Sequence, residues 1–222
     1  MKIKHEKKIR FAFYVSGAAS RLIKLLETHS AVIKDTILVV NDNAPNVRLG
    51  RLLLKNRFQY VEIDYKKRDL ILRDKNIYIS NLLFEKFKAF DIDYCFCFGG
   101  RILKGELVRA YKNKIINFHP SVLPSFPGLK AIDQALHNRS YLLGNTAHFI
   151  DEGIDTGPVI MQCILNYKNY LTYESVLSLQ IPMVEQIYRW IIDKRLIMNG
   201  DEVTIRDADY ASTIFYPKLE IK

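Results

Sequence analysis

Short apolar runs alternate with longer amphipathic stretches through the first half of the chain. The short runs have the length and composition of buried strands, and the amphipathic stretches carry apolar residues at helical spacing. We therefore predict strands at 9–16, 37–40, 60–63, 94–98 and 115–118. The intervening helices are predicted at 21–28, 47–55, 77–90 and 104–111.

The same alternation predicts where a ligand would bind. Strands and helices in this order are typical of a Rossmann-like α/β fold, a mostly parallel sheet with helices on both faces. Ligands bind such sheets beyond the carboxyl ends of the strands. Three segments follow strands at that edge, namely Ser16–Ser20, Gly99–Arg101 and Asn117–Pro120. We expect these three segments to border one crevice.

The pattern changes after Pro120, where several prolines interrupt the chain. A short helix is predicted at 132–137, followed by two strands joined by an acidic loop at 151–158. One long helix is predicted at 173–194, with a kink at Pro182 because proline cannot donate the backbone hydrogen bond of a helix. The strands of this part are predicted at 144–150, 159–165 and 203–205.

Composition places the chain among ordinary globular proteins. Of its 222 residues, 49% are apolar and 26% are charged, which excludes disordered and collagen-like chains. It has neither a run of about 18 apolar residues, as a membrane span needs, nor the pattern of a signal peptide. Cys95, Cys97 and Cys163 lack a zinc-type spacing, so we expect a reduced, cytoplasmic protein with Cys95 and Cys97 in its core.

Charge raises the question of a nucleic-acid partner. The 33 lysines and arginines exceed the 24 acids by nine, and a basic chain rich in aromatic residues is one mark of RNA-binding modules. However, no basic motif interleaved with aromatic residues occurs, and most tyrosines and phenylalanines fall within apolar periodic runs. We therefore expect no nucleic-acid or membrane partner, and an RNA-binding module is the weaker alternative.

Two polar groups stand out against this background. Asn117 and His119 are two residues apart on a predicted strand, so their side chains share one face. The loop Asp151–Gly157 holds three acids and two glycines between apolar strands. Taken singly, each has an ordinary explanation, a histidine satisfied at a strand end and a solvated loop.

Together these groups resemble a known family. From Asn117 to Gln162 the chain is similar to the folate-dependent formyltransferases, whose motif is Asn-x-His followed by an aspartate in a loop Asp-x-Gly-x-Asp-x-Gly. The separation of 36 residues between His119 and Asp155 is typical of that family. Its His-Pro-Ser-x-Leu-Pro and Thr-x-His-Phe sequences also recur, at 119–124 and 146–149. The resemblance implies one formyltransferase domain over 1–222, with a Rossmann-like half at 9–120 and a folate-loop portion at 121–222.

The resemblance also implies roles. Asn117 and His119 would stabilise the oxyanion that forms when an amine attacks the formyl group of N10-formyltetrahydrofolate, and Asp155 would carry the proton. No metal is required. In the family, the backbone after the fourth strand and the aspartate loop hold the pterin. The implied folate-binding residues here are Arg101, Ile102, Leu103, Asp151, Gly153 and Ile154.

The acceptor side matches less well. Glycinamide ribonucleotide transformylases hold a phosphate on a Ser-Gly-x-Gly-Ser-Asn turn, where this chain has Ala19 in place of a glycine and Arg21 in place of the asparagine. The family's phosphate arginine falls on Lys75, and its ribose-binding glutamate falls on Gln180 by an alignment anchored at Trp190. The implied acceptor-binding residues are Ser16, Gly17, Ala18, Ala19, Ser20, Arg21, Lys75 and Gln180.

These differences favour a different amine acceptor, an amino sugar that bears phosphate or a nucleotide, with glycinamide ribonucleotide as the close alternative. Methionyl-tRNA is disfavoured because its enzymes carry an added C-terminal domain, and few residues follow the last predicted helix. Formyltetrahydrofolate hydrolysis is disfavoured because those enzymes carry an N-terminal domain with no room before Ile9. The sequence does not decide between a monomer and a homodimer.

Overall fold

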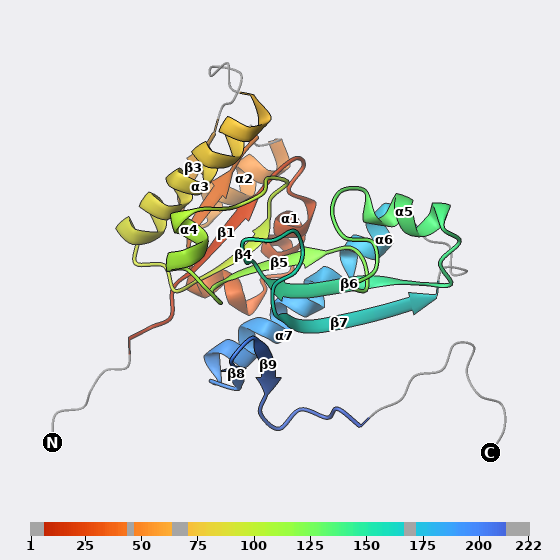
Figure 1. The fold of residues 1–222 in the computed structure, drawn as a ribbon. Coiled ribbons are helices and arrows are strands. Elements are labelled where there is room, and N and C mark those ends of the chain that lie inside the picture. The colour runs from red at the N-terminus through yellow and green to blue at the C-terminus, as the bar shows by residue number, and fades with distance from the viewer. Residues whose placement is uncertain (1–6, 44–46, 64–70, 167–171, 212–222) are drawn as a thin grey trace, which may run out of the picture.

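A computed structural model describes residues 7–43, 47–63, 71–166 and 172–211. Seven strands form one sheet in the order β3-β2-β1-β4-β5-β6-β7. The first five strands in this order are parallel to one another. β6 pairs antiparallel with β5, and β7 pairs antiparallel with β6 (Figure 1). The strands are β1 Phe11–Val15, β2 Thr36–Asn41, β3 Gln59–Glu62, β4 Tyr94–Phe98, β5 Ile115–His119, β6 Leu142–Phe149 and β7 Val159–Asn166.

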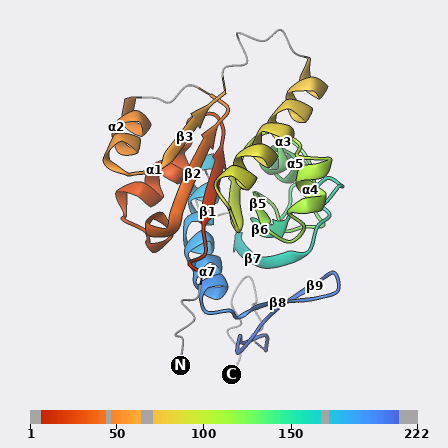
Figure 2. The ribbon, with the colours of Figure 1, turned by 90° about the vertical axis from the view of Figure 1, so that its left-hand side faces the viewer.

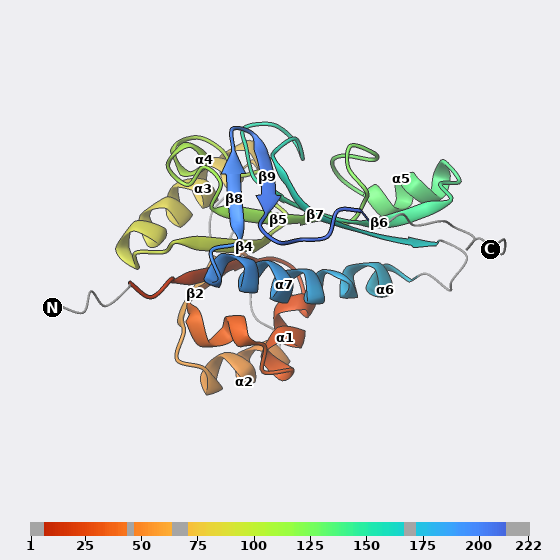
Figure 3. The same cartoon turned by 90° about the horizontal axis from the view of Figure 1, so that it is seen from below.

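Helices cover both faces of this sheet, as the sequence predicted. The helices α1, α2 and α7 lie on one face, and α3 and α4 lie on the other (Figures 2 and 3). A short 3-10 helix, η1, precedes β2. The bounds are α1 Ser20–Glu27, η1 Ala31–Asp35, α2 Val47–Lys55, α3 Leu72–Ala89, α4 Glu106–Ala110, α5 Ala131–His137, α6 Tyr173–Ser178 and α7 Gln180–Ile192.

Alternation along the central strands divides the core into two layers. Phe11 and Phe13 of β1 pack under α1 and α7, whereas Tyr14 of the same strand packs under α3. Cys95 and Cys97 of β4 belong to the second layer, and burial raises the pKa of the Cys97 thiol to about 12. The prediction that both cysteines are core residues is therefore confirmed.

The C-terminal region differs from the prediction in two respects. The expected helix 173–194 is two helices, α6 and α7, separated at Leu179. Pro182 explains the break, because it cannot donate to the carbonyl of Ser178 four residues earlier. A second sheet pairs the expected strand, β9 Glu202–Ile205, with β8 Leu196–Asn199, which the sequence analysis missed.

The direction in which successive strands are added to the sheet reverses between β1 and β4. β1 pairs with β2 on one side and with β4 on the other, so the chain turns in opposite directions after β1 and after β4. Such a switch point opens a crevice beyond the carboxyl ends of the strands. The segments that begin at Ser16, Gly99 and Asn117 all lie at this edge, which confirms the expected convergence.

Candidate functional site

Asn117 and His119 come from the end of β5. Ile115, two residues before Asn117, packs into the layer under α3 and α4, so the alternation directs both polar side chains to that face. The antiparallel strand β6 lies directly beside them, with Asn117 opposite His148 and His119 opposite Thr146. His119 is 5% exposed, so its imidazole is largely removed from water.

Asp155 reaches the same place from the loop that joins β6 to β7, which passes beside β4 and β5 (Figure 1). One carboxylate oxygen, Oδ2, lies 3.2 Å from Nδ1 of His119. The other, Oδ1, lies 3.5 Å from Nδ2 of Asn117. Three side chains separated by up to 38 residues therefore meet at the carboxyl edge of the sheet, in the combination that the motif implied.

The surroundings favour the ionised form of this carboxylate. Burial alone raises the pKa of Asp155. Hydrogen bonds from His148 and from the backbone N–H of Gly128 at 2.8 Å, together with the charge of His119, act in the opposite direction and prevail. The pKa of Asp155 consequently lies below its ordinary value. Asp155 is thus held as a proton acceptor at neutral pH.

Three residues of this site were missed as functional residues. Nε2 of His148 lies 3.2 Å from Nδ2 of Asn117 and 3.5 Å from Oδ1 of Asp155. Nε2 of His119 lies 2.8 Å from the carbonyl oxygen of Phe126, and Gly128 donates to Asp155. His148 was visible in the Thr-x-His-Phe sequence, whereas nothing in the pattern around Phe126 indicated that its backbone turns back onto β5.

The aspartate loop is stabilised by its own first acid. Asp151 accepts hydrogen bonds from the N–H of Gly153 at 3.0 Å and from the hydroxyl of Thr156 at 2.9 Å. A side chain at position 153 would collide with Thr156, so this turn requires glycine. Asp151 is therefore used within the loop, and Ile154, which is 56% exposed, is the large apolar side chain that the loop presents outward.

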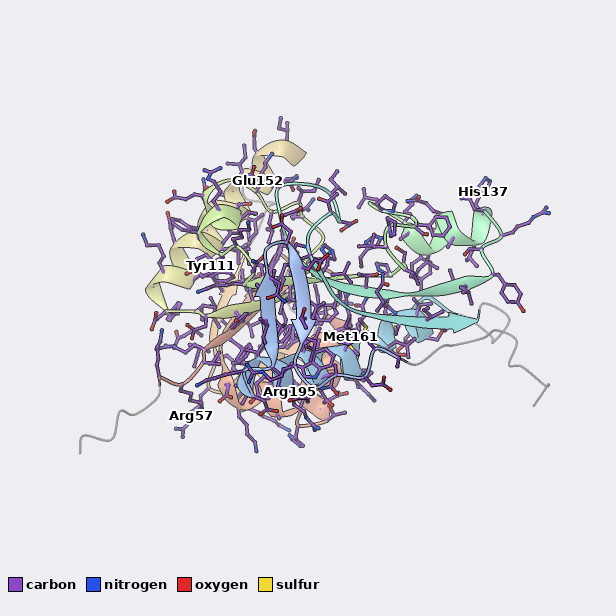
Figure 4. All side chains as sticks on the ribbon, turned by 60° about the horizontal axis from the view of Figure 1, so that its bottom comes forward. Arg57, Tyr111, His137, Glu152, Met161 and Arg195 are labelled. Atoms are coloured by element: carbon purple, nitrogen blue, oxygen red, sulfur yellow. The ribbon has the colours of Figure 1, made fainter. Side chains whose placement is uncertain are left out.

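The loop also contacts the face that carries α4. Glu152 lies at the outer end of the loop, on the side of α4 and Tyr111 (Figure 4), and accepts a hydrogen bond from Arg109 at 3.3 Å. Ile150 packs against the same core layer as Leu103. The two segments predicted to bind folate, 101–103 and 151–155, thus both border the core layer under α3 and α4.

Within the first of these segments the three residues have different environments. Leu103 is buried in the core at 3% exposure, whereas Ile102 is 50% exposed. Arg101 is partly exposed, and its Nε lies 3.6 Å from Oδ2 of Asp42. Ile102 and Arg101 are therefore accessible to a ligand, while any contribution of Leu103 is made through its backbone.

The acceptor-side turn, 16–20, leads directly into α1. Gly17 and Ala19 both adopt positive φ angles, 60° and 51°, which glycine tolerates and alanine disfavours. Ala19, which stands where the resemblance implies a glycine, therefore lies in the left-handed region of backbone conformation. The hydroxyl of Ser16 lies 3.5 Å from the carbonyl oxygen of Phe98, which joins this turn to the end of β4.

Arg21 and Gln180 are brought together, although 159 residues separate them. Nη1 of Arg21 donates to Oε1 of Gln180 at 2.7 Å, and Nη2 donates to the Phe98 carbonyl at 3.4 Å. The guanidinium also lies over the Phe98 ring, 4.5 Å from its centroid. Gln180 has no exposed surface and donates to Oδ1 of Asn145 at 2.7 Å. Gln180 therefore contacts Arg21 and is not itself exposed to a ligand.

The charge of Arg21 has no acidic partner among the described residues. Its contacts there are a carboxamide oxygen, a carbonyl oxygen and an aromatic ring, and burial lowers its pKa to about 10. A desolvated cation with neutral partners is a favourable place for an anion. Lys75 lies in the first turn of α3, which follows the carboxyl end of β3 and so begins at the same edge of the sheet.

The described ranges contain neither a metal-ligand cluster nor a membrane-spanning helix. No group of three or more His, Cys, Asp or Glu side chains there is suited to a metal ion. Within the same ranges, no helix is long and apolar enough to cross a membrane.

The fold and the Asn–His–Asp cluster define an α/β protein with a group-transfer site at its sheet edge. The family model described as formyl transferase matches residues 9–178, and the chain belongs to this family. The phosphoribosylglycinamide formyltransferase of Bacillus subtilis is 37% identical over 100 residues, which cover 45% of this chain and 51% of that protein. The formyltetrahydrofolate deformylase of Haemophilus influenzae is 37% identical over 99 residues, covering 44% and 36%.

A solved structure supports the same assignment. Glycinamide ribonucleotide transformylase 1 from Symbiobacterium toebii matches with a TM-score of 0.70 and 27% identity, covering 90% of this chain and 94% of that one. The aligned part of the Bacillus subtilis relative, by contrast, is about half of its length. The predicted fold class and family are confirmed.

Proposed function

We propose that the protein transfers a formyl group from N10-formyltetrahydrofolate to the primary amine of phosphoribosylglycinamide. The observation that carries this proposal is the meeting of Asn117, His119 and Asp155 at the crevice, where the Asp155 carboxylate lies 3.2 Å from His119 and 3.5 Å from Asn117. The names of the relatives support it, since they act on a formyl group, on tetrahydrofolate or on phosphoribosylglycinamide.

The chemistry uses the three side chains in sequence. The acceptor nitrogen attacks the formyl carbon, a new carbon–nitrogen bond forms, and the carbonyl oxygen becomes an oxyanion. Asn117 donates an amide N–H to that oxygen, and His119 donates a ring N–H once its contact with the Phe126 carbonyl is released. Asp155 accepts the proton that the amine loses, directly or through water, and N10 gains a proton as its bond to carbon breaks.

Arg21 supports an acceptor that carries phosphate. Its partly buried guanidinium lies beside the turn 16–20, at the start of α1, and has only neutral partners among the described residues. A phosphate there would compensate its charge by charge-assisted hydrogen bonds. Ser16–Ser20, Lys75 and Gln180 are proposed to complete the acceptor site, Gln180 by holding Arg21.

An amino sugar bearing phosphate or a nucleotide is the second candidate. The sequence analysis favoured it because Ala19, Arg21, Lys75 and Gln180 depart from the glycinamide ribonucleotide pattern. We now place it second, because the Bacillus subtilis relative is named a phosphoribosylglycinamide formyltransferase. These departures remain the specific reason to test it.

An acceptor assay decides between these functions. Purified protein is mixed with N10-formyltetrahydrofolate and, separately, phosphoribosylglycinamide, a panel of phosphorylated and nucleotide-linked amino sugars, or buffer alone. We expect tetrahydrofolate to form with phosphoribosylglycinamide and not with buffer. Formation with an amino sugar alone would establish the second candidate, and equal formation in buffer would identify a deformylase instead. No formation in any arm would contradict the proposed reaction.

A further inference from the structure

A second polar cluster lies at the switch point, outside the Asn–His–Asp cluster. Asp42 follows β2, is 4% exposed, and accepts a hydrogen bond from the hydroxyl of Tyr14 at 3.0 Å. Its Oδ2 also lies 3.6 Å from Nε of Arg101. The cluster therefore joins the ends of β1 and β2 to the segment after β4.

The backbone is shaped to accommodate this cluster. Tyr14 is fully buried, and its ring lies where a side chain on Gly99 would be, so any other residue at 99 would collide with it. Glycine at this position lets the tyrosine hydroxyl reach Asp42 while the chain turns toward Arg101. The arrangement thus needs particular residues on three different strands or strand ends.

Burying a carboxylate carries a free-energy cost, which the partners of Asp42 reduce. Burial raises the pKa of Asp42, and the hydrogen bond from Tyr14 and the charge of Arg101 offset this only in part. The side chain of Arg101 is 28% exposed, so the pair places one charge inside the protein and the other at the crevice. A buried acid that orients a partly exposed arginine is the usual arrangement of a positioning residue.

We propose that Asp42, held by Tyr14, is a positioning residue that orients the guanidinium of Arg101 toward the glutamyl carboxylates of the folate co-substrate. This inference rests on the proposed function, because it requires that folate occupy the crevice beside 101–103. The glutamyl group carries the carboxylates of a folate, and guanidinium–carboxylate pairing depends strongly on orientation. Asp42 itself does not touch the ligand.

Folate binding without any acceptor provides the test. Asp42→Asn and Tyr14→Phe keep the shape of each side chain and remove, respectively, the negative charge and the hydroxyl. Glu27→Gln is the matched control, since it makes the same change of net charge in an exposed pair with Arg48 on α1 and α2. Calorimetry is carried out with tetrahydrofolate and with tetrahydropteroate, which lacks the glutamate.

We expect Asp42→Asn to weaken tetrahydrofolate binding by about five- to tenfold and Tyr14→Phe by a smaller factor, with Glu27→Gln unchanged. Binding of tetrahydropteroate should be the same in all four proteins. The proposal would be overturned if Asp42→Asn weakened the binding of tetrahydrofolate and tetrahydropteroate equally. It would also be overturned if Asp42→Asn left the tetrahydrofolate affinity unchanged. If Asp42→Asn does not fold, unchanged tetrahydrofolate binding by Tyr14→Phe overturns it.

A double variant identifies the route of the effect. In an Arg101→Ala background, Asp42→Asn should cause no further loss of tetrahydrofolate affinity, because its only proposed route is through Arg101. An undiminished loss in that background would contradict positioning. If the wild-type protein binds neither ligand, the proposed function has failed. If the wild-type protein and every variant bind tetrahydrofolate equally tightly, the proposed function stands and only this inference is refuted.

Discussion

The Asn117–His119–Asp155 cluster, which we propose as the transfer site, and the region around Arg21, which we propose as the acceptor edge, differ in how their charges are compensated. At the transfer site, the carboxylate of Asp155 is surrounded by an imidazole, a carboxamide and a backbone N–H, all within 3.5 Å. At the acceptor edge, Arg21 is removed from water but has a carboxamide, a carbonyl and a ring as neighbours among the described residues. The two regions lie at the same edge of one sheet.

This difference indicates that the protein itself compensates the charge of Asp155, whereas a bound substrate would compensate the charge of Arg21. A site whose charges are already compensated is preorganised, so its effect falls on the rate of the chemical step. A buried cation with neutral partners gains its counter-charge from a ligand, so its effect falls on binding. The contrast predicts that substitutions in the two regions divide between kcat and KM.

The largest expected effect is on kcat at the transfer site. His119→Ala and Asp155→Asn should each lower kcat by about 10²–10⁴-fold in the acceptor assay, because each removes a group that meets the reacting atoms. Steady-state kinetics with both substrates varied would measure this, and circular dichroism would check the fold. The KM for the acceptor should change much less than kcat.

A histidine remote from the crevice provides the matched control. His137 is exposed at the end of α5, at the far end of the molecule (Figure 4), so His137→Ala should leave kcat unchanged. Nearly normal turnover by His119→Ala or Asp155→Asn would contradict a role of that residue in the mechanism. The contrast with the region around Arg21 would then lose its basis.

The next effect concerns the acceptor. Arg21→Ala should raise the acceptor KM by about ten- to a hundredfold and leave the folate KM and kcat close to wild type, since it deletes a charge-assisted contact. Arg21→Lys should recover part of this loss, because the charge remains without the planar fork. Arg51→Ala, on the exposed side of α2, is the control for net charge. An unchanged acceptor KM in Arg21→Ala would contradict the anion role.

Gln180 tests whether that contact is indirect. Gln180→Leu removes the partner of Arg21 and leaves Asn145 without its amide donor inside the core. We therefore expect a smaller rise in acceptor KM than for Arg21→Ala, and a lower melting temperature. In the double variant, the rise in acceptor KM can be compared with those of the two single variants. If the two free-energy effects on the acceptor KM add fully, Gln180 contacts the acceptor directly.

The sequence predicted the sheet and the transfer cluster well, for a physical reason. Buried parallel strands read as apolar runs, and residues two apart on a strand must share a face, so Asn117 and His119 were placed by local rules. The hairpin of β8 and β9 also had a local signal, since Asn199-Gly200 is a strong turn dipeptide and Gly200 has a φ of 64°.

What the sequence could not supply depends on contacts between distant segments. The pairing of Arg21 with Gln180 crosses 159 residues, and the return of Phe126 onto His119 depends on a loop whose path no periodicity describes. The helix predicted over 104–111 is the shorter α4, Glu106–Ala110, and Gly105 directly before it has a non-helical φ of 74°. Lys75 was placed by alignment alone, and its role stays a prediction.

The smallest expected effect concerns stability in acid. Because the pKa of Asp155 is lower in the folded protein than in the unfolded chain, the unfolded state binds more protons as the pH falls. The stabilisation is fully present above the ordinary aspartate pKa of about 4 and is lost as the pH falls through the lower folded value. Urea unfolding should therefore show Asp155→Asn less stable than wild type near pH 6, by about 1 kcal/mol, with the difference shrinking toward pH 3. A difference that stays constant or widens in acid would show that the carboxylate is not stabilised by its neighbours, and the contrast with Arg21 would disappear.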